Sequence, residues 1–137
     1  MEPLANERIK HLEMIQAIVT RLAGNSFLLK GWTVTLVSAL FALAAKDAKP
    51  YFALLAYFPC LMFWALDGYF LWQERLFRGL YDEVRKANGE VDFSMDTSNL
   101  GGNLSRWIDA TLSKNLSLFY GIIFAVVVGV TILLRCR

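Results

Sequence analysis

The sequence predicts an all-α integral membrane protein, with three transmembrane helices and amphipathic cytoplasmic helices in a homo-oligomeric bundle. Two apolar runs, residues 26–45 and 50–72, follow each other closely, and a third covers residues 116–134. Each run has about the 20 residues that a helix needs to cross the bilayer core. Hydrophobic residues make up 56% of the chain, whereas soluble domains contain about 45–50%. Three spans bury only a small core, so we expect lateral assembly with further copies.

Charge and hydropathy divide the chain of 137 residues into four segments. We expect an N-terminal amphipathic cytoplasmic helix in residues 1–25 and a transmembrane hairpin in residues 26–72. Residues 73–115 should hold a cytoplasmic helical extension, a loop and an interfacial helix. The third transmembrane helix and the tail occupy residues 116–137. The length is that of a single domain.

The N-terminal segment reads as an amphipathic helix from Asn6, the predicted N-cap, to Ala23. Its apolar face either lies on the bilayer surface or packs against the second cytoplasmic helix. Gly24-Asn25-Ser26 favours a break or bend before the first span, with one continuous helix as the alternative. The apolar residues that recur at steps of three or four are Ile9, Leu12, Ile15, Val19 and Leu22.

The helix of the second span continues beyond the membrane. Residues 68–87 contain no proline, and their apolar positions extend a helical stripe to Asn88-Gly89, a sequence typical of a helix end. Pro59 should kink the same helix inside the bilayer, because its ring clashes with the preceding turn.

A polar connector follows, and residues 90–103 with Gly101-Gly102 are predicted to form a loop. Residues 104–112 then form a short amphipathic helix. We expect Trp107 to act as a membrane-interface anchor on its apolar face. That face is predicted to hold Leu104, Trp107, Ile108 and Leu112.

Basic residues predict the orientation of the spans. Of the 14 lysines and arginines, only Lys46, Lys49, Arg135 and Arg137 flank the side of the short hairpin loop and the C-terminus. We therefore expect the N-terminus and the central loop in the cytoplasm, and the C-terminus on the opposite side of the membrane.

Lys30 and Asp67 are charged residues inside apolar runs. In an antiparallel hairpin both lie at similar depth, roughly one helical turn from the same membrane face. Because charge within a bilayer is costly and usually functional, the pair is a candidate gate or ion-pathway element. A structural salt bridge that fixes the hairpin, or a Lys30 side chain that snorkels to the interface, is the alternative.

Small residues repeat at every fourth position of the third span. Ser117, Gly121, Ala125 and Gly129 form this stripe, and such stripes let helix backbones approach closely. It predicts helix packing, within one chain or between chains, and it also permits a narrow pore lining.

The cytoplasmic extension carries a basic row. Arg75, Arg78 and Arg85 lie near one helix face, with Lys86 beside them. Guanidinium groups can bind phosphate with two hydrogen bonds each, so the row is a candidate site for a nucleotide or another anion. Positive-inside bias and local ion pairs are the alternative explanation.

The sequence contains no pattern that indicates catalysis or a bound metal. His11 is the only histidine, and no CxxC motif, Gly-rich phosphate loop or nucleophile–base pattern is present. We therefore expect neither an enzyme nor a cofactor, and name no catalytic residue and no metal ligand.

Several stretches resemble a group of small bacterial membrane proteins of anti-phage defence loci, and in particular the transmembrane effectors of the Hailong system. These stretches are residues 11–16, 25–32, 56–59, 63–71 and 73–78. The match covers roughly residues 9–85, and the C-terminal third matches less distinctly.

The resemblance implies an oligomeric ion channel of the bacterial inner membrane. Together with the distribution of basic residues, this location predicts that the C-terminus lies in the periplasm. It implies a nucleotidyltransferase-like partner whose oligonucleotide product controls the channel. In such a channel the basic row would receive the oligonucleotide, while the stripe and the level of Lys30 and Asp67 would shape the pore. The alternative is a non-conducting membrane scaffold or accessory subunit that anchors a cytoplasmic partner.

Overall fold

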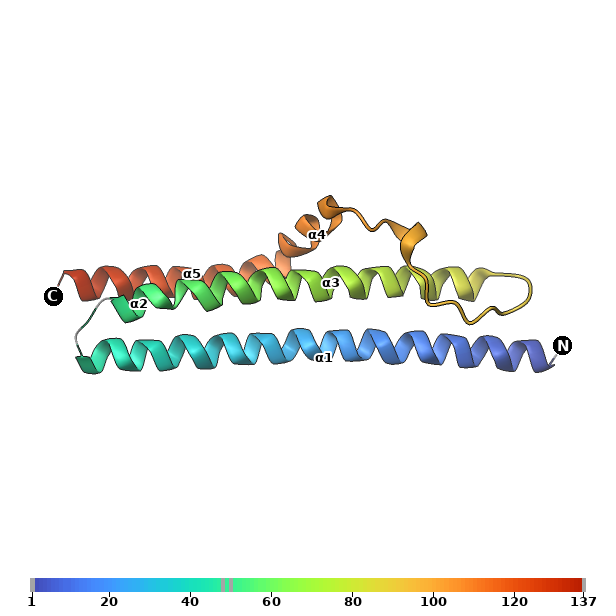
Figure 1. Cartoon of the computed structure of the whole chain (residues 1–137), viewed down its shortest axis with the longest axis horizontal. Coiled ribbons are helices and arrows are strands. Elements are labelled where there is room, and N and C mark those ends of the chain that lie inside the picture. Colours follow the sequence, from blue (N-terminus) through green and yellow to red (C-terminus); the bar gives the residue numbers. More distant parts are fainter. Residues whose placement is uncertain (1, 48, 50, 137) are drawn as a thin grey trace.

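The computed structural model describes residues 2–47, 49 and 51–136, and within these ranges the chain is helical without strands. Helix α1 covers Glu2–Asp47, and α2 (Tyr51–Leu55) and α3 (Tyr57–Lys86) run back beside it (Figure 1). A long connection that includes the short 3₁₀ helix η1 (Ser98–Leu100) leads to α4 (Leu104–Thr111) and α5 (Lys114–Arg135).

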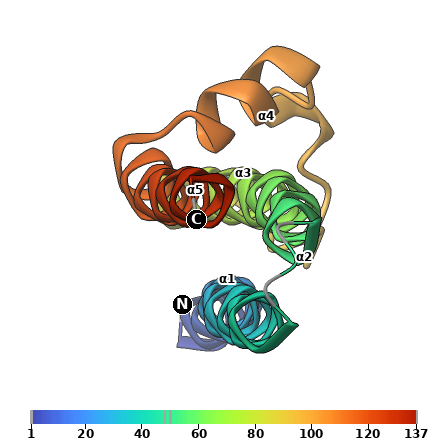
Figure 2. The ribbon, with the colours of Figure 1, turned by 90° about the vertical axis from the view of Figure 1, so that its left-hand side faces the viewer.

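Helix α3 lies at the centre of the molecule. Viewed along the long axis, α1 and α4 lie on opposite sides of the layer that α3 and α5 form (Figure 2). The N-terminal end of α1 and the connection after α3 share one end of the molecule, and the C-terminal end of α5 lies at the other (Figure 1).

Three helical segments are long and apolar enough to cross a membrane: α1, the stretch formed by α2 and α3, and α5. Their outward faces carry large apolar side chains that are strongly exposed, such as Phe27, Phe58 and Leu133. Apolar surface of this extent is unfavourable in water and marks contact with lipid or other protein. The prediction of an all-helical membrane protein is therefore confirmed.

Helix α1 runs without interruption through Gly24-Asn25-Ser26, so the continuous alternative describes the structure and the break does not occur. A single helical glycine costs only about 1 kcal/mol relative to alanine, and packing along α3 offsets this. The prediction of Asn6 as N-cap is wrong, because α1 begins at Glu2. An acidic residue and a proline, here Glu2 and Pro3, both suit the first turn of a helix.

The second span is interrupted next to Pro59, where the sequence predicted a kink. The helix stops at Leu55 and resumes at Tyr57, which places Pro59 in the first turn of α3. A proline in a helix interior clashes with the carbonyl four residues earlier, here that of Leu55. The break at Ala56 relieves this clash, and the amide of Cys60 donates to the Ala56 carbonyl over 3.3 Å.

Beyond the predicted spans, α1 and α3 continue together as a two-helix arm, which we define as residues 2–25 and 73–86. Ile15, Val19 and Leu80 form its buried core. The N-terminal apolar face therefore packs against α3, one of the two predicted alternatives, through Ile15 and Val19, whereas Ile9 of the predicted face is exposed. The half-buried residues packed on this core from α3 are Phe77, Tyr81 and Val84.

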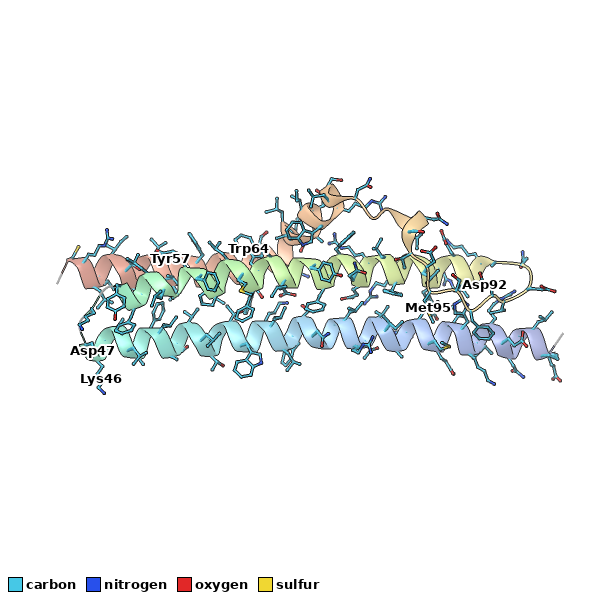
Figure 3. All side chains as sticks on the ribbon, viewed as in Figure 1. Lys46, Asp47, Tyr57, Trp64, Asp92 and Met95 are labelled. Carbon is cyan, nitrogen blue, oxygen red and sulfur yellow. The ribbon has the colours of Figure 1, made fainter. Side chains whose placement is uncertain are left out.

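The connection after α3 folds back onto the arm. Met95 packs against the arm core, and Figure 3 shows Asp92 and Met95 on the connection beside the arm. The buried His11 ring donates from Nε2 to the Ser94 carbonyl over 2.9 Å and lies 5.5 Å from the Phe93 ring. Helix α3 ends at Lys86, next to the predicted stop, whereas η1 was not predicted.

Candidate functional site

A buried set of polar side chains joins the three spanning segments at Asp67. The carboxylate of Asp67 on α3 is completely buried and lies 2.6 Å from the Lys30 Nζ on α1. Its Oδ1 accepts a hydrogen bond from the Ser26 hydroxyl, and its Oδ2 accepts one from the Tyr120 hydroxyl of α5 over 3.0 Å. We call these four residues the Asp67 cluster.

Ser26 and Lys30 reach Asp67 from successive turns of α1. Their spacing of four residues places both side chains on one helix face, and the Lys30 ammonium donates to the Ser26 hydroxyl over 2.7 Å. The hydroxyl thus bridges the ammonium and the carboxylate. The ion pair confirms that Lys30 and Asp67 meet at one level of the hairpin. The side chain of Lys30 remains 26% exposed, so the cluster is open on its α1 side.

Tyr120 is positioned by packing between α3 and α5. Its ring stacks on Trp64 with ring centroids 6.0 Å apart and an angle of 7° between the planes. Cys60 and Leu116 are buried in the same contact, and Trp64 lies along it in Figure 3. The aromatic packing therefore aims the hydroxyl of Tyr120 at the carboxylate.

Complete pairing is what makes a carboxylate tolerable at this position. Burying an unpaired ion costs several kcal/mol, and the attraction of a counter-ion repays this only with good geometry and further hydrogen bonds. Both oxygens of Asp67 have partners, and the pair with Lys30 is formally neutral. Chemically, the cluster can hold three helices in one register, and separating it would expose two charges inside the membrane.

Helix α4 docks against α3 at Gly68, next to Asp67. A Cβ at Gly68 would lie only 2.9 Å from the Thr111 Cα, so the position needs glycine. Two indole N–H groups tie the helices together: Trp64 Nε1 donates to the Thr111 carbonyl over 2.8 Å, and Trp107 Nε1 donates to the Ala65 carbonyl over 3.2 Å. The close approach thus fixes α4 at the level of the Asp67 cluster.

The predicted apolar face of α4 is wrong for one member. Leu104, Ile108 and Leu112 are exposed, whereas Trp107 is half-buried and turned toward α3. The hydrogen bond to the Ala65 carbonyl and the burial of Ala110 account for the difference, because they dock the other side of α4 on α3.

The small-residue stripe faces away from the rest of the chain. Ala125 and Gly129 are exposed, and Ser117 and Gly121 are half-buried. A Cβ at Gly121 or Gly129 would meet no atom within 4 Å. Close packing within one chain, one of the predicted alternatives, therefore does not occur at these glycines. Packing between copies and pore lining stay predictions.

The basic row divides into paired and unpaired members. Arg78 bonds Glu74 over 2.7 Å and Arg85 bonds Asp82 over 3.2 Å, and both arginines are largely exposed. Lys86 is exposed in the last turn of α3. Arg75 has no ion-pair partner among the residues described and lines a cavity near the Asp67 cluster. Local ion pairs thus account for part of the row, and its role in binding an oligonucleotide stays a prediction.

Sequence reasoning missed two members of the cluster and the glycine beside it. From the sequence, Ser26 is predicted only as part of the break at Gly24-Asn25-Ser26, although it lies one turn before Lys30. Tyr120 is the only hydroxyl-bearing aromatic residue in the third span, a signal that could have marked it as a partner for Asp67. No local signal distinguishes Gly68 from Gly121, because the approach of α4 depends on the tertiary fold. Among the described residues, no three His, Cys, Asp or Glu side chains converge as metal ligands would.

The fold and the cluster define an all-helical membrane protein in which a buried ion pair links the spanning segments. Comparison with protein-family models, curated proteins and solved structures finds no match.

Proposed function

We propose that this protein is a membrane effector of bacterial anti-phage defence that forms a homo-oligomeric ion channel gated by a regulatory oligonucleotide. The Asp67 cluster carries the proposal, since ionisable residues inside a membrane commonly mark ion pathways. The resemblance of residues 9–85 to Hailong effectors supplies the biological setting. The bacterial inner membrane is the proposed location, with the arm in the cytoplasm and the C-terminus in the periplasm.

The continuity of the long helices supports a link between ligand and gate. Helix α1 carries both the arm residues and Lys30, and α3 carries both Asp67 and the basic row. Packed helices switch between discrete arrangements more readily than they deform. A ligand that shifts α1 against α3 in the arm would therefore act on the ion pair between Lys30 and Asp67.

The outward stripe on α5 supports assembly from several copies. Its two glycines have open space around them within the chain, which leaves room for the backbone of another helix. In the proposed channel, α5 helices of neighbouring copies pack along this stripe or line the pore with it. The single-chain fold buries little of its apolar helices, which fits such an assembly.

Current recordings of the purified full chain in planar bilayers test the channel. We expect discrete currents whose open probability changes when short oligonucleotides are added. Asp67→Asn removes the charge at nearly constant size and should change conductance or gating. The matched change Asp47→Asn removes an exposed carboxylate at the end of α1, away from the Asp67 cluster and the basic row, and should leave the currents as they are. Silence of the wild type under all ligand conditions would contradict the proposal.

Oligonucleotide binding by the basic row needs its own test. Combined charge reversal of Arg75, Arg78 and Arg85 should weaken the binding of a short oligonucleotide measured at fixed salt, because phosphate contacts depend strongly on salt. Binding that survives this change would remove the arm from the proposed mechanism while leaving the channel itself open to test.

A non-conducting scaffold or accessory subunit is the second candidate. The complete burial and hydrogen bonding of Asp67 favour it, because a purely structural role in holding the helices together is enough to explain such a cluster. In that case Asp67→Asn would lower the unfolding temperature while neither variant nor wild type conducts. A cytoplasmic partner would then be expected to bind the arm.

A further inference from the structure

We infer that a cavity beside the Asp67 cluster binds the phosphate group of an anionic phospholipid. The cavity has a volume of about 480 Å³ and lies between α1, α3 and the start of α5. Its described lining includes three basic side chains, Lys30, Arg75 and Lys114, and no acidic one. Three helices thus bring one cation each to a pocket whose size suits a small ligand.

The positive charge of this cavity is largely uncompensated. Arg75 and Lys114 form no ion pair among the described residues, unlike Arg78 with Glu74. Lys30 bonds Asp67 and Ser26, and an ammonium has three donors, so one donor remains for a ligand. An anion in the cavity would meet hydrogen-bond donors from three directions.

A neutral donor on the wall points to the same ligand. The Ser113 hydroxyl is buried at the cavity and has no hydrogen-bond partner within the described chain. A buried polar group without a partner is unfavourable, and rotation of the Ser113 side chain toward the cavity would let a phosphate oxygen supply the missing bond. Ser113 also precedes the first turn of α5, whose free backbone N–H groups add to the attraction for an anion.

The location favours a lipid over a soluble phosphate. Lys30 lies about one turn inside the first predicted span, and α5 enters the third span directly after Lys114. The cavity is therefore at the level where lipid headgroups lie on the arm side. Leu71 and Leu116 form an apolar part of the wall, where the glycerol and first acyl carbons could pack. Basic residues next to membrane spans attract anionic headgroups.

Lipid retention by the full chain tests the inference without any measurement of current. The protein is reconstituted in vesicles of phosphatidylcholine alone or mixed with phosphatidylglycerol, extracted in mild detergent and examined by native mass spectrometry. Wild type should retain phosphatidylglycerol in preference to phosphatidylcholine. Arg75→Gln and Lys114→Gln should each weaken this binding about tenfold or more, the effect expected for losing a hydrogen bond to a charged group. Ser113→Ala should weaken it less, with no change in net charge.

Arg21→Gln is the matched control, because Arg21 is an exposed basic residue of α1 outside the cavity. Equal retention of the two lipids by wild type, or an equal loss in Arg21→Gln and Arg75→Gln, would overturn the inference. Circular dichroism checks that the variants fold, as expected because Arg21, Arg75 and Lys114 are exposed and outside ion pairs and Ser113→Ala removes a single atom.

Thermal unfolding in detergent separates the sources of phosphate. Short-chain phosphatidylglycerol should raise the unfolding temperature of wild type more than the matching phosphatidylcholine, and this excess should vanish in Lys114→Gln, which changes the cavity but not the basic row. Inorganic phosphate and a short oligonucleotide at the same ionic strength should not stabilise the protein in a way that depends on Lys114. If either does so, the cavity is a site for a soluble phosphate and the lipid assignment is wrong.

Discussion

The Asp67 cluster and the ion pairs of the arm hold carboxylates at similar distances from basic groups, yet they differ in what they can do. Lys30 and Asp67 are 2.6 Å apart and Arg85 and Asp82 are 3.2 Å apart. Asp67 is completely buried and Lys30 is 26% exposed, whereas Arg85 and Asp82 are 59% and 57% exposed. Exposed pairs contribute about 0–1 kcal/mol, but removing one partner of a buried pair costs about 3–5 kcal/mol. Burial decides the consequence, and distance alone does not.

The two kinds of pair also carry different structural information. The pairs of Arg78 with Glu74 and of Arg85 with Asp82 lie within α3 and follow from sequence spacing alone. The Asp67 cluster takes one or two residues from each of three helices, so it forms only when the tertiary fold is in place. Only the cluster can therefore report on, or control, the relative position of the helices.

Asp67→Ala should have the largest effect on stability. It removes the acceptor of the Ser26 and Tyr120 hydroxyls and the counter-ion of Lys30, whose side chain is 26% exposed, so we expect a loss of about 3 kcal/mol in the free energy of unfolding, the low end of the range for a buried pair. Denaturant titration in mixed micelles measures the loss.

The double change Lys30→Met with Asp67→Leu provides the control. Apolar residues of similar size often replace a buried ion pair at no cost, so stability should return toward wild type. A double variant as unstable as Asp67→Ala would show that the charge is not the cause of the loss.

Gly68→Ala tests whether close helix packing beside the Asp67 cluster also contributes to stability. The added methyl group meets the Thr111 backbone, with the Cβ 2.9 Å from Cα, and overpacking of this kind costs about 1–3 kcal/mol. Gly24→Ala is the matched control, since Gly24 is an exposed helical residue of α1 outside the stripe and its Cβ would meet no atom within 4 Å. The same unfolding titration should show a loss for Gly68→Ala and none for Gly24→Ala. Equal effects would mean that helix propensity, and not the contact with α4, determines the result.

Much of the fold followed from the sequence because the signals are local. Apolar runs set the three spans, and the interruption next to Pro59 and the end of α3 before Asn88-Gly89 lie close to where their residue types predicted. The sequence alone does not decide whether α1 continues through Gly24, because helix propensity and tertiary packing oppose each other there. η1 and the docking of the connection onto His11 depend on contacts between distant residues, which no local pattern reveals.

The candidate site was only partly predictable for the same reason. Opposite charges at one depth of a hairpin predicted the pair of Lys30 and Asp67, and the structure forms it. The hydroxyl of Tyr120 and the role of Gly68 arise from α5 and α4, whose positions relative to α3 are tertiary properties. The stripe on α5 shows the converse, since a strong sequence pattern finds no partner at Gly121 and Gly129 within one chain.

Arg85→Gln should change stability by less than about 1 kcal/mol, as measured for exposed ion pairs. The change removes the bond to Asp82 but leaves the Asp82 side chain, which is 57% exposed, in contact with water. Raising the salt concentration should reduce even this difference, because exposed pairs are screened. A loss as large as that of Asp67→Ala would mean that the arm pair is buried in the assembled protein, against a copy or a partner.

Asp96 is expected to have the smallest effect on stability. Its carboxylate represents a third environment, because it is exposed but accepts a hydrogen bond from the backbone. Its Oδ1 accepts the Ser98 N–H over 2.9 Å, and hydrogen bonds from Ser98 lower the pKa of Asp96 below its usual value. A lowered pKa stabilises the fold above the unfolded pKa of about 3.9, and this contribution is lost as the pH falls through the lower, folded value.

In an acid titration followed by NMR, the Ser98 amide shift should therefore have its midpoint below about 3.9. The Asp96→Asn variant should lack that transition. A midpoint at or above the usual value would show that the turn does not bind the charged form, and Asp96 would then behave as an ordinary solvated carboxylate.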